Sequence, residues 1–319
     1  MIYLRNICLA CATLAIVMAF GWSASGRAET LSGQTFIRPA MVKVDFTSDS
    51  ITPEIVAGDA GVAGRAVTID DPARVASISK LVVAIGVMRL VEQGKLDLDR
   101  DVNDYLGWRV RNPAFPDAPI TLRALLSHQS GLRDTVDYIV PLDGILEAVL
   151  ADPKAWELSH APGTYFSYAN INSPLIAAVM EGATGVRFDR LMARLVLTPL
   201  RLDACYNWGA GCRDGRRAKA VTLLRPNGDL ARDAPLRGPD PCAVYPASDG
   251  SCDVDKLYKI GRNGSAFSPQ GGLRISARDL AKIGQLLLRD GAPLLSPKSF
   301  AEMITPAWTF DGKNGDDDK

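Results

Sequence analysis

The chain has 319 residues, with 36 basic and 36 acidic side chains, so its formal net charge is zero at pH 7. This balance gives no electrostatic reason to expect a nucleic-acid partner, because such binding depends on an excess of basic charge. With 47% hydrophobic residues, the composition is that of an ordinary globular protein and supplies enough apolar side chains for a core.

Residues 1–28 predict a secretory signal. Arg5 provides the positive flank, residues 7–20 the apolar stretch, and Gly26-Arg27-Ala28 offers small residues, Gly26 and Ala28, at the cleavage positions. A retained membrane anchor is the alternative, but the apolar run is short for a span. We therefore expect a periplasmic or secreted protein with one domain over residues 29–319 and no stable membrane anchor after cleavage.

Alternating hydrophobicity predicts a strand over residues 42–46, which could pair with residues 51–57 across a polar turn. Residues 77–93 are apolar on nearly all sides and predict a buried helix. Residues 100–198 carry helical patterns interrupted by Pro- and Gly-rich loops, and residues 277–289 predict an amphipathic helix. The chain therefore combines strands near its start with a mainly helical middle.

Four cysteines remain after the predicted signal is removed, and they are Cys205, Cys212, Cys242 and Cys252. An even number in an exported protein predicts disulfides. Three pairings are possible, and sequence proximity favours Cys205–Cys212 and Cys242–Cys252. A zinc site is the alternative, but these four cysteines include no C-x-x-C pair and the chain has only two histidines. We expect neither a metal nor a cofactor.

Ser77 lies three residues before Lys80 at the start of the predicted buried helix. This spacing places the hydroxyl and the amine on one helix face, about a turn apart. A serine hydroxyl is a weak nucleophile until a neighbour takes its proton, and Lys80 is placed to do so if burial and positive potential lower its pKa. A helix-capping serine and an exposed lysine would give the same spacing, so this pair needs a second motif.

That second motif is Tyr168-Ala-Asn170, which follows a Pro-Gly-Thr turn. Tyr168 would supply a second proton-transfer group, and Asn170 an amide that holds a substrate amide or carbonyl. A turn with a half-buried aromatic residue is the alternative interpretation. Lys80 and Tyr168 are both candidates for the general base, and the sequence does not choose between them.

Two further segments follow the same order: Leu-Leu-Ser-His-Gln-Ser-Gly-Leu over residues 125–132 and Gly-Gly-Leu-Arg-Ile-Ser over residues 271–276. In order and spacing, the four motifs together resemble those of the serine beta-lactamase and penicillin-binding-protein superfamily. The nearest branch comprises class C beta-lactamases, D-alanyl-D-alanine carboxypeptidases and beta-lactamase-like esterases. The resemblance covers roughly residues 55–290. It implies an α/β (α+β) fold, with an antiparallel sheet flanked by helices, an inserted mainly helical region, and the active site between them.

The resemblance further implies that Ser77, Lys80 and Tyr168 are catalytic and that Asn170, Gly271 and Gly272 bind substrate. It implies an exported, monomeric serine hydrolase that forms an acyl-enzyme on an ester or amide, with a D-alanyl-peptide or a small ester ahead of a beta-lactam. The partner would be a small-molecule or peptide substrate. The alternative is a periplasmic binding protein, or a fragment, that keeps the cleft without turnover.

His128 invites a Ser-His-Asp interpretation, but the chain has no G-x-S-x-G nucleophile elbow, so an α/β-hydrolase is not expected. In the superfamily that it resembles, the segment around His128 is structural and lies near the cleft.

The C-terminal end departs from the superfamily pattern. Members carry a third motif, Lys-Thr-Gly or His-x-Gly, on a strand that also donates to the oxyanion hole. The one look-alike is Lys313-Asn314-Gly315, whose acidic and glycine neighbours do not favour a strand. We therefore expect a tail there and the C-terminal strands of the sheet to be missing. The chain would then be either a fragment of an active enzyme or a protein altered enough to have lost activity.

Overall fold

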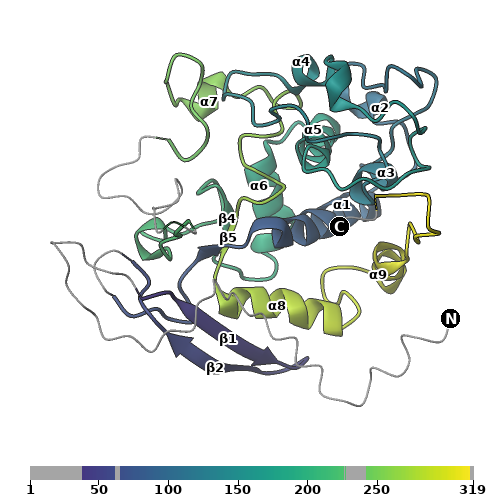
Figure 1. Ribbon diagram of the computed structural model, residues 1–319. Helices are drawn as coiled ribbons and strands as arrows, with labels where there is room; N and C mark the ends of the chain where they lie inside the picture. Colours follow the sequence, from purple (N-terminus) through teal and green to yellow (C-terminus); the bar gives the residue numbers. More distant parts are fainter. Residues whose placement is uncertain (1–37, 62–64, 226, 228–241, 317–319) are drawn as a thin grey trace. The chain divides into compact units, whose positions relative to one another are not determined.

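The computed structural model describes residues 38–61, 65–225, 227 and 242–316 (Figure 1). The predicted signal, residues 1–28, lies outside the described residues. Contacts divide the chain into two compact units: residues 1–73, 213–239 and 275–293 form the first, and residues 74–212, 240–274 and 294–319 form the second.

The described elements mix helices and short strands. The strands are β1 Met41–Phe46, β2 Ile51–Ala57, β3 Ala73–Arg74, β4 Cys205–Tyr206 and β5 Leu273–Ile275. The α-helices are α1 Ser79–Glu92, α2 Asn103–Leu106, α3 Leu122–Leu126, α4 Leu146–Leu150, α5 Asn172–Thr184, α6 Phe188–Met192, α7 Val254–Leu257, α8 Ala277–Leu288 and α9 Pro297–Ile304. Short 3-10 turns span Ala76–Ile78, Pro153–Ala155 and Arg217–Lys219, and a π-helical turn spans Ala193–Leu197.

In the first unit, β1 and β2 form the predicted antiparallel hairpin, and helix α8 packs against β1 (Figure 1). Val42 and Val44 of β1 share a hydrophobic core with Ala277 and Ala281 of α8. Gly284 makes this close packing possible, because a Cβ atom there would lie 2.2 Å from the Phe46 ring. The helix predicted from the amphipathic pattern of residues 277–289 is thus confirmed, and Ala277 and Ala281 lie on its buried side.

The second unit is mainly helical. Helix α1 is buried over most of its length, and its start is held by the small sheet in which β4 pairs antiparallel with β5. The Tyr206 hydroxyl donates to the Ser79 carbonyl oxygen at 3.0 Å, and the Leu273 N–H donates to Ser79 Oγ at 3.1 Å. These two bonds connect both strands to the first turn of the helix.

Both predicted disulfides are present. Cys205 is bonded to Cys212, and Cys242 is bonded to Cys252. The first bridge includes a residue of β4 and therefore stabilises the strand that contacts Ser79.

The segment around Lys313-Asn314-Gly315 corrects one expectation, because it is not a loose tail. Its backbone runs beside Phe166: the Phe166 N–H donates to the Asn314 carbonyl at 2.9 Å, and the Asp316 N–H donates to the Phe166 carbonyl at 3.0 Å. Trp308 stacks on the Phe166 ring with centroids 4.4 Å apart. This packing orders a stretch whose composition does not favour a strand, although only one isolated parallel bridge forms, between Phe166 and Gly315.

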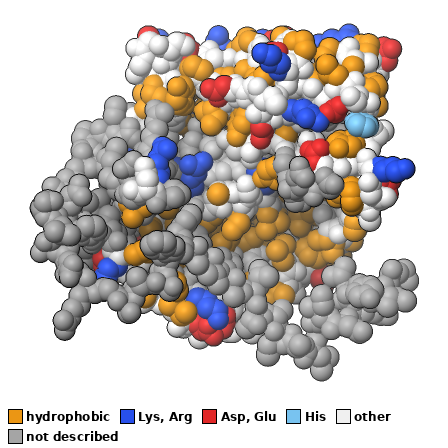
Figure 2. All heavy atoms as spheres, viewed as in Figure 1, with side chains coloured by type: hydrophobic (Ala, Val, Ile, Leu, Met, Phe, Trp, Pro, Cys, Tyr) orange, Lys and Arg blue, Asp and Glu red, His pale blue; other side chains and the backbone are white. Residues whose placement is uncertain are grey.

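The predicted fold class is confirmed: antiparallel pairs of strands are combined with helices, and the middle of the chain is mainly helical. That strands of the superfamily sheet are missing stays a prediction. Within the described ranges, no helix is long and apolar enough to cross a membrane. On the face shown in Figure 2, basic and acidic side chains are scattered among hydrophobic ones rather than gathered by sign.

Candidate active site

Ser77 lies on a tight turn rather than in the helix proper. The 3-10 turn Ala76–Ile78 precedes α1, which begins at Ser79, two residues later than the sequence pattern predicts. Ala76 has a φ of 47°, a left-handed conformation that costs a non-glycine residue about 1–3 kcal/mol. The Val75 N–H donates to the Leu273 carbonyl at 3.1 Å and holds this turn against β5. The strained turn leaves Ser77 exposed at the helix start.

The Lys80 amine lies among four oxygen atoms. Its Nζ donates to Ser77 Oγ at 3.0 Å, to the Tyr168 hydroxyl at 2.6 Å, to Asn170 Oδ1 at 2.9 Å and to the Gln270 carbonyl at 3.2 Å. An ammonium group has three donors and no acceptor, so a shell of oxygen acceptors suits its charged form. The predicted spacing therefore does bring Lys80 to Ser77, together with both residues of the second motif.

Tyr168 completes a triangle with Ser77 and Lys80. Its hydroxyl lies 2.9 Å from Ser77 Oγ, and the Lys80 ammonium is 4.8 Å from its ring centroid. Burial acts to raise the pKa of the Tyr168 phenol, but hydrogen bonds from Lys80 and Ser77 and the positive charge of Lys80 outweigh it, so the net pKa is lowered. The phenolate form is thereby made more accessible.

Asn170 is held on both sides of its amide. Its Nδ2 donates to Asp134 Oδ2 at 2.9 Å, which directs Oδ1 toward Lys80. Because the amide faces a carboxylate on one side and an ammonium on the other, its orientation is set by the network. Asn170 therefore acts here through Lys80, and its predicted contact with substrate stays a prediction.

Gly271 and Gly272 are buried behind the turn that carries Ser77. A Cβ atom at Gly271 would lie 3.6 Å from Ala76 Cα, and one at Gly272 would lie 2.7 Å from the Ser268 carbonyl oxygen. The Gly271 carbonyl accepts a hydrogen bond from Arg74 Nε at 2.9 Å. Packing therefore excludes a side chain at Gly272, whereas one at Gly271 would meet only ordinary van der Waals contacts. Substrate binding by both glycines stays a prediction.

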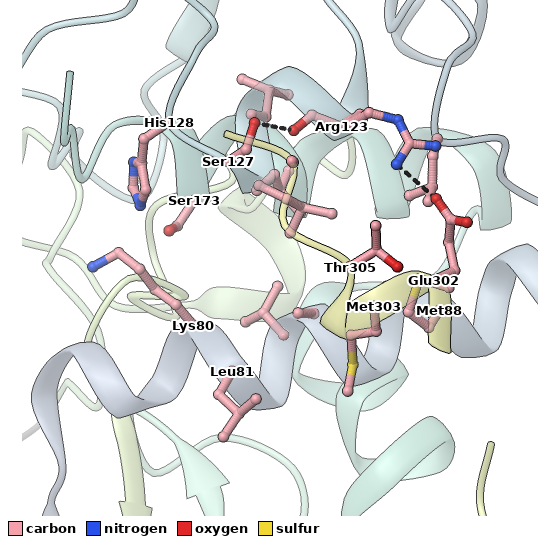
Figure 3. Close-up of a pocket in the computed structure, with 17 residues that line it drawn as sticks. Lys80, Leu81, Met88, Arg123, Ser127, His128, Ser173, Glu302, Met303 and Thr305 are labelled. Carbon is pink, nitrogen blue, oxygen red and sulfur yellow. Dashed lines mark hydrogen bonds and ion pairs between the residues drawn. The ribbon is translucent and has the colours of Figure 1, made fainter. Parts of the chain in front are cut away.

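A cavity of about 280 Å³ lies beside Lys80, bounded by residues of α1, α3, α5 and the segment 302–307. Figure 3 shows Lys80 and His128 near one end of the cavity and the Arg123–Glu302 ion pair near the other. Its lining is largely aliphatic, and Ser77 is not part of it. The reactive atoms therefore gather around Ser77, at the edge of this cavity rather than within it. In the described part of the chain, no group of three or more His, Cys, Asp or Glu side chains could hold a metal ion.

Comparison with known proteins assigns the chain that carries this site to a family. Residues 53–317 match the family model described as Beta-lactamase. The chain belongs to this family. Among curated relatives, esterase EstB of Burkholderia gladioli is 30% identical over 256 residues, which cover 70% of this chain and 65% of EstB. The D-alanyl-D-alanine-carboxypeptidase/endopeptidase AmpH of Escherichia coli K12 is 26% identical over 196 residues, which cover 58% of this chain and 46% of AmpH.

Solved structures show the same Beta-lactamase family fold. A class C beta lactamase from Rhodobacter sphaeroides aligns with a TM-score of 0.60 at 20% identity, covering 84% of this chain and 65% of that one. EstCE1, a hydrolase with promiscuous acyltransferase activity, aligns with a TM-score of 0.58 at 23% identity, covering 82% and 70%. The matched part spans less than two thirds of each of the curated relatives named above. The superfamily predicted from the motifs is confirmed.

Sequence reasoning missed three groups that shape this site: Asp134, Arg74 and the Gln270 carbonyl. Asp134 follows the segment 125–132 by two residues, and that closeness to a recognised motif is the one signal that could have drawn attention to it. Gln270 acts through its backbone, so its residue type carries no signal.

Proposed function

We propose that this chain is a serine hydrolase that forms an acyl-enzyme on Ser77. The observation that carries the proposal is the position of Ser77 Oγ, which lies 2.9 Å from the Tyr168 hydroxyl and 3.0 Å from Lys80 Nζ. A hydroxyl nucleophile within hydrogen-bond distance of two proton-transfer groups is the arrangement that nucleophilic catalysis requires.

In the proposed reaction, Tyr168 acts as the general base in its phenolate form. Ser77 Oγ attacks the substrate carbonyl carbon while Tyr168 takes the serine proton. The bond to the leaving alcohol or amine then breaks, and Tyr168 gives its proton to that group. In the second half, water attacks the acyl carbon and passes a proton to Tyr168, and the bond to Ser77 breaks as Oγ regains that proton. The free acid leaves, and the enzyme is restored.

Lys80 would support this cycle as a fixed cation. Its ammonium stabilises the phenolate and donates to Ser77 Oγ, so the charge that forms on either oxygen is balanced at short range. The oxygen shell around Lys80 supports this assignment of roles over one in which a neutral Lys80 takes the proton.

For the substrate, we propose an ester or amide, with a D-alanyl-peptide or a small ester ahead of a beta-lactam. The curated names of the relatives, an esterase and a D-alanyl-D-alanine carboxypeptidase, support these two classes. We also propose export to the periplasm or beyond, as one domain over residues 29–319 that works as a monomer. The two disulfides support export, because such bonds persist in oxidising compartments.

The test is covalent labelling with a fluorophosphonate, together with hydrolysis of p-nitrophenyl acetate. Wild-type protein should be labelled on the Ser77 peptide, and Ser77→Ala should lose both labelling and turnover. Ser159→Ala is the matched control, because Ser159 is exposed and should leave both unchanged. An adduct on Ser79 or Ser130 would refute the assignment of the nucleophile. A folded wild-type chain that takes no label would instead support the binding-protein alternative.

Release of D-alanine from a D-alanyl-D-alanine peptide, measured beside ester hydrolysis, separates the two substrate classes.

A further inference from the structure

We propose that His128 is a positioning residue that holds the Tyr168 phenol in place beside Ser77. This inference rests on the proposed function and deepens it, because it names the group that fixes the orientation of the base. The superfamily resemblance gave this segment a structural part near the cleft, and the contacts in the structure define a more specific one.

His128 binds the backbone on both sides of Tyr168. The Ser167 N–H donates to the His128 carbonyl oxygen at 2.9 Å, and the Ala169 N–H donates to His128 Nδ1 at 3.3 Å. The residues before and after Tyr168 are thus both hydrogen-bonded to His128. The two rings also lie against each other, with centroids 4.4 Å apart and planes 31° apart. Three contacts from a single side chain and its carbonyl therefore restrict where the phenol can lie.

The surroundings of His128 require its Nδ1 to be an acceptor. Asn172, with 1% of its surface exposed, receives the Ser130 hydroxyl on Oδ1 at 2.6 Å, so its Nδ2 faces His128 Nδ1 at 3.1 Å. The Asn172 amide is fixed in this orientation because the same Nδ2 also donates to the Ala169 carbonyl oxygen at 3.0 Å. Two N–H groups, from Asn172 and Ala169, thus converge on Nδ1. Nδ1 is therefore the atom of the ring that accepts from the Tyr168 segment.

The backbone conformation of His128 also helps to hold the Tyr168 segment. Its φ is 58°, a left-handed conformation in which His, Asn and Asp are enriched among non-glycine residues. His128 follows Ser127, the C-cap residue of α3. The left-handed conformation turns the chain there, so both the carbonyl and the ring of His128 reach the Tyr168 segment. A residue that only filled space beside the cavity of Figure 3 would need the ring but not the acceptor. The two roles can therefore be separated by substitution.

The experiment compares His128→Phe with His128→Asn in the full chain. Phe keeps an aromatic ring against Tyr168 but removes the Nδ1 acceptor, whereas Asn keeps an acceptor near that position and tolerates the positive φ. We expect His128→Phe to lower kcat for p-nitrophenyl acetate by about 10- to 100-fold, the effect of leaving a buried donor unpaired next to the base. KM should change much less, and His128→Asn should restore most of kcat.

Differences in folding between the variants are corrected for by counting the active sites in each preparation. The final extent of fluorophosphonate labelling gives the fraction of chains with a folded Ser77, and kcat is expressed per labelled site at a temperature below the melting point of every variant. If His128→Phe turns over at the wild-type rate per site, the positioning role is wrong. If Phe and Asn lose activity equally, in proportion to lost melting temperature, His128 is structural only. If the wild-type chain neither labels nor turns over, the proposed function itself fails, a result that these two outcomes cannot mimic.

Discussion

The Asp134 carboxylate accepts hydrogen bonds from both the backbone and the side-chain amide of Asn170. Oδ2 lies 2.8 Å from the Asn170 backbone nitrogen and 2.9 Å from Nδ2. The other oxygen accepts the Ile171 N–H at 3.0 Å. One acidic side chain thus anchors the start of α5 and directs Asn170 Oδ1 toward the Lys80 ammonium.

Asp134→Ala should therefore disturb Lys80 indirectly. Without the carboxylate, Asn170 is free to rotate, and we expect kcat/KM for p-nitrophenyl acetate to fall about tenfold, in line with hydrogen bonds to a charged group. Asp134→Asn retains one acceptor oxygen, so its kcat/KM should lie between those of the wild type and Asp134→Ala. Unchanged kcat/KM in Asp134→Ala would show that the orientation of Asn170 does not matter for turnover.

The pH dependence of turnover should report the Lys80–Tyr168 contact. The base must be deprotonated, so kcat/KM rises with pH through its pKa, and Lys80 lowers the pKa of Tyr168. In Lys80→Met this effect is lost, the pKa of Tyr168 rises, and the acidic limb should move to higher pH, which lowers activity at pH 7 by up to tenfold for each unit that it moves.

Lys80→Arg is the matched control. Because it keeps the positive charge, its acidic limb should lie closer to the wild-type pH than that of Lys80→Met. Tyr168→Phe should lower turnover by about 10²- to 10⁴-fold, as expected for loss of a general base. A limb that stays in place in Lys80→Met would show that another group is the base.

The two disulfides should differ in their effect on activity. Each closes a short loop, so replacing both cysteines of either bridge by serine should lower the free energy of unfolding by about 2–3 kcal/mol in chemical denaturation. Loss of Cys205–Cys212 should also lower kcat, because β4 carries Tyr206, whose hydroxyl bonds to the first turn of α1. The variant without Cys242–Cys252 is the control for the effect of lost stability on kcat. If the two variants had equal kcat, β4 would have no part in holding the start of α1 for catalysis.

Glu181 of α5 should matter for stability rather than for chemistry. Its carboxylate is fully buried and accepts three hydrogen bonds, each 2.7 Å long, from the Phe188 N–H, the Tyr258 hydroxyl and the Gly261 N–H. Glu181→Ala leaves these donors unpaired, and we expect about 3–5 kcal/mol of destabilisation in denaturant unfolding. Val149→Ala, in a short helix elsewhere in the unit, should cost much less. A melting temperature near wild type in Glu181→Ala would contradict this expectation.

The sequence was most informative where side-chain types and spacing determine the contact. Ser77 and Lys80 are three residues apart where a 3-10 turn leads into α1, so their proximity followed from local geometry. Sequence proximity likewise favoured the disulfide pairing. The contacts of Lys80 with the Gln270 carbonyl and of Arg74 with the Gly271 carbonyl could not be predicted, because any residue type supplies a carbonyl. The segment 314–316 was misjudged for a related reason. Its own residues do not favour a strand, and its order depends on Trp308 and on the distant Phe166.

The contact between Ser167 and Asp316 has a consequence for the order of events during synthesis. The Ser167 hydroxyl donates to the Asp316 carboxylate at 2.7 Å across a sequence separation of 149 residues. At ordinary rates of translation, a ribosome needs roughly 7–30 s to cover that distance. Throughout this interval, a growing chain already contains Ser77, Lys80 and Tyr168, but the segment that carries Tyr168 lacks its neighbour, residues 314–316. The order of synthesis therefore delays the finished site until residue 316 has been made.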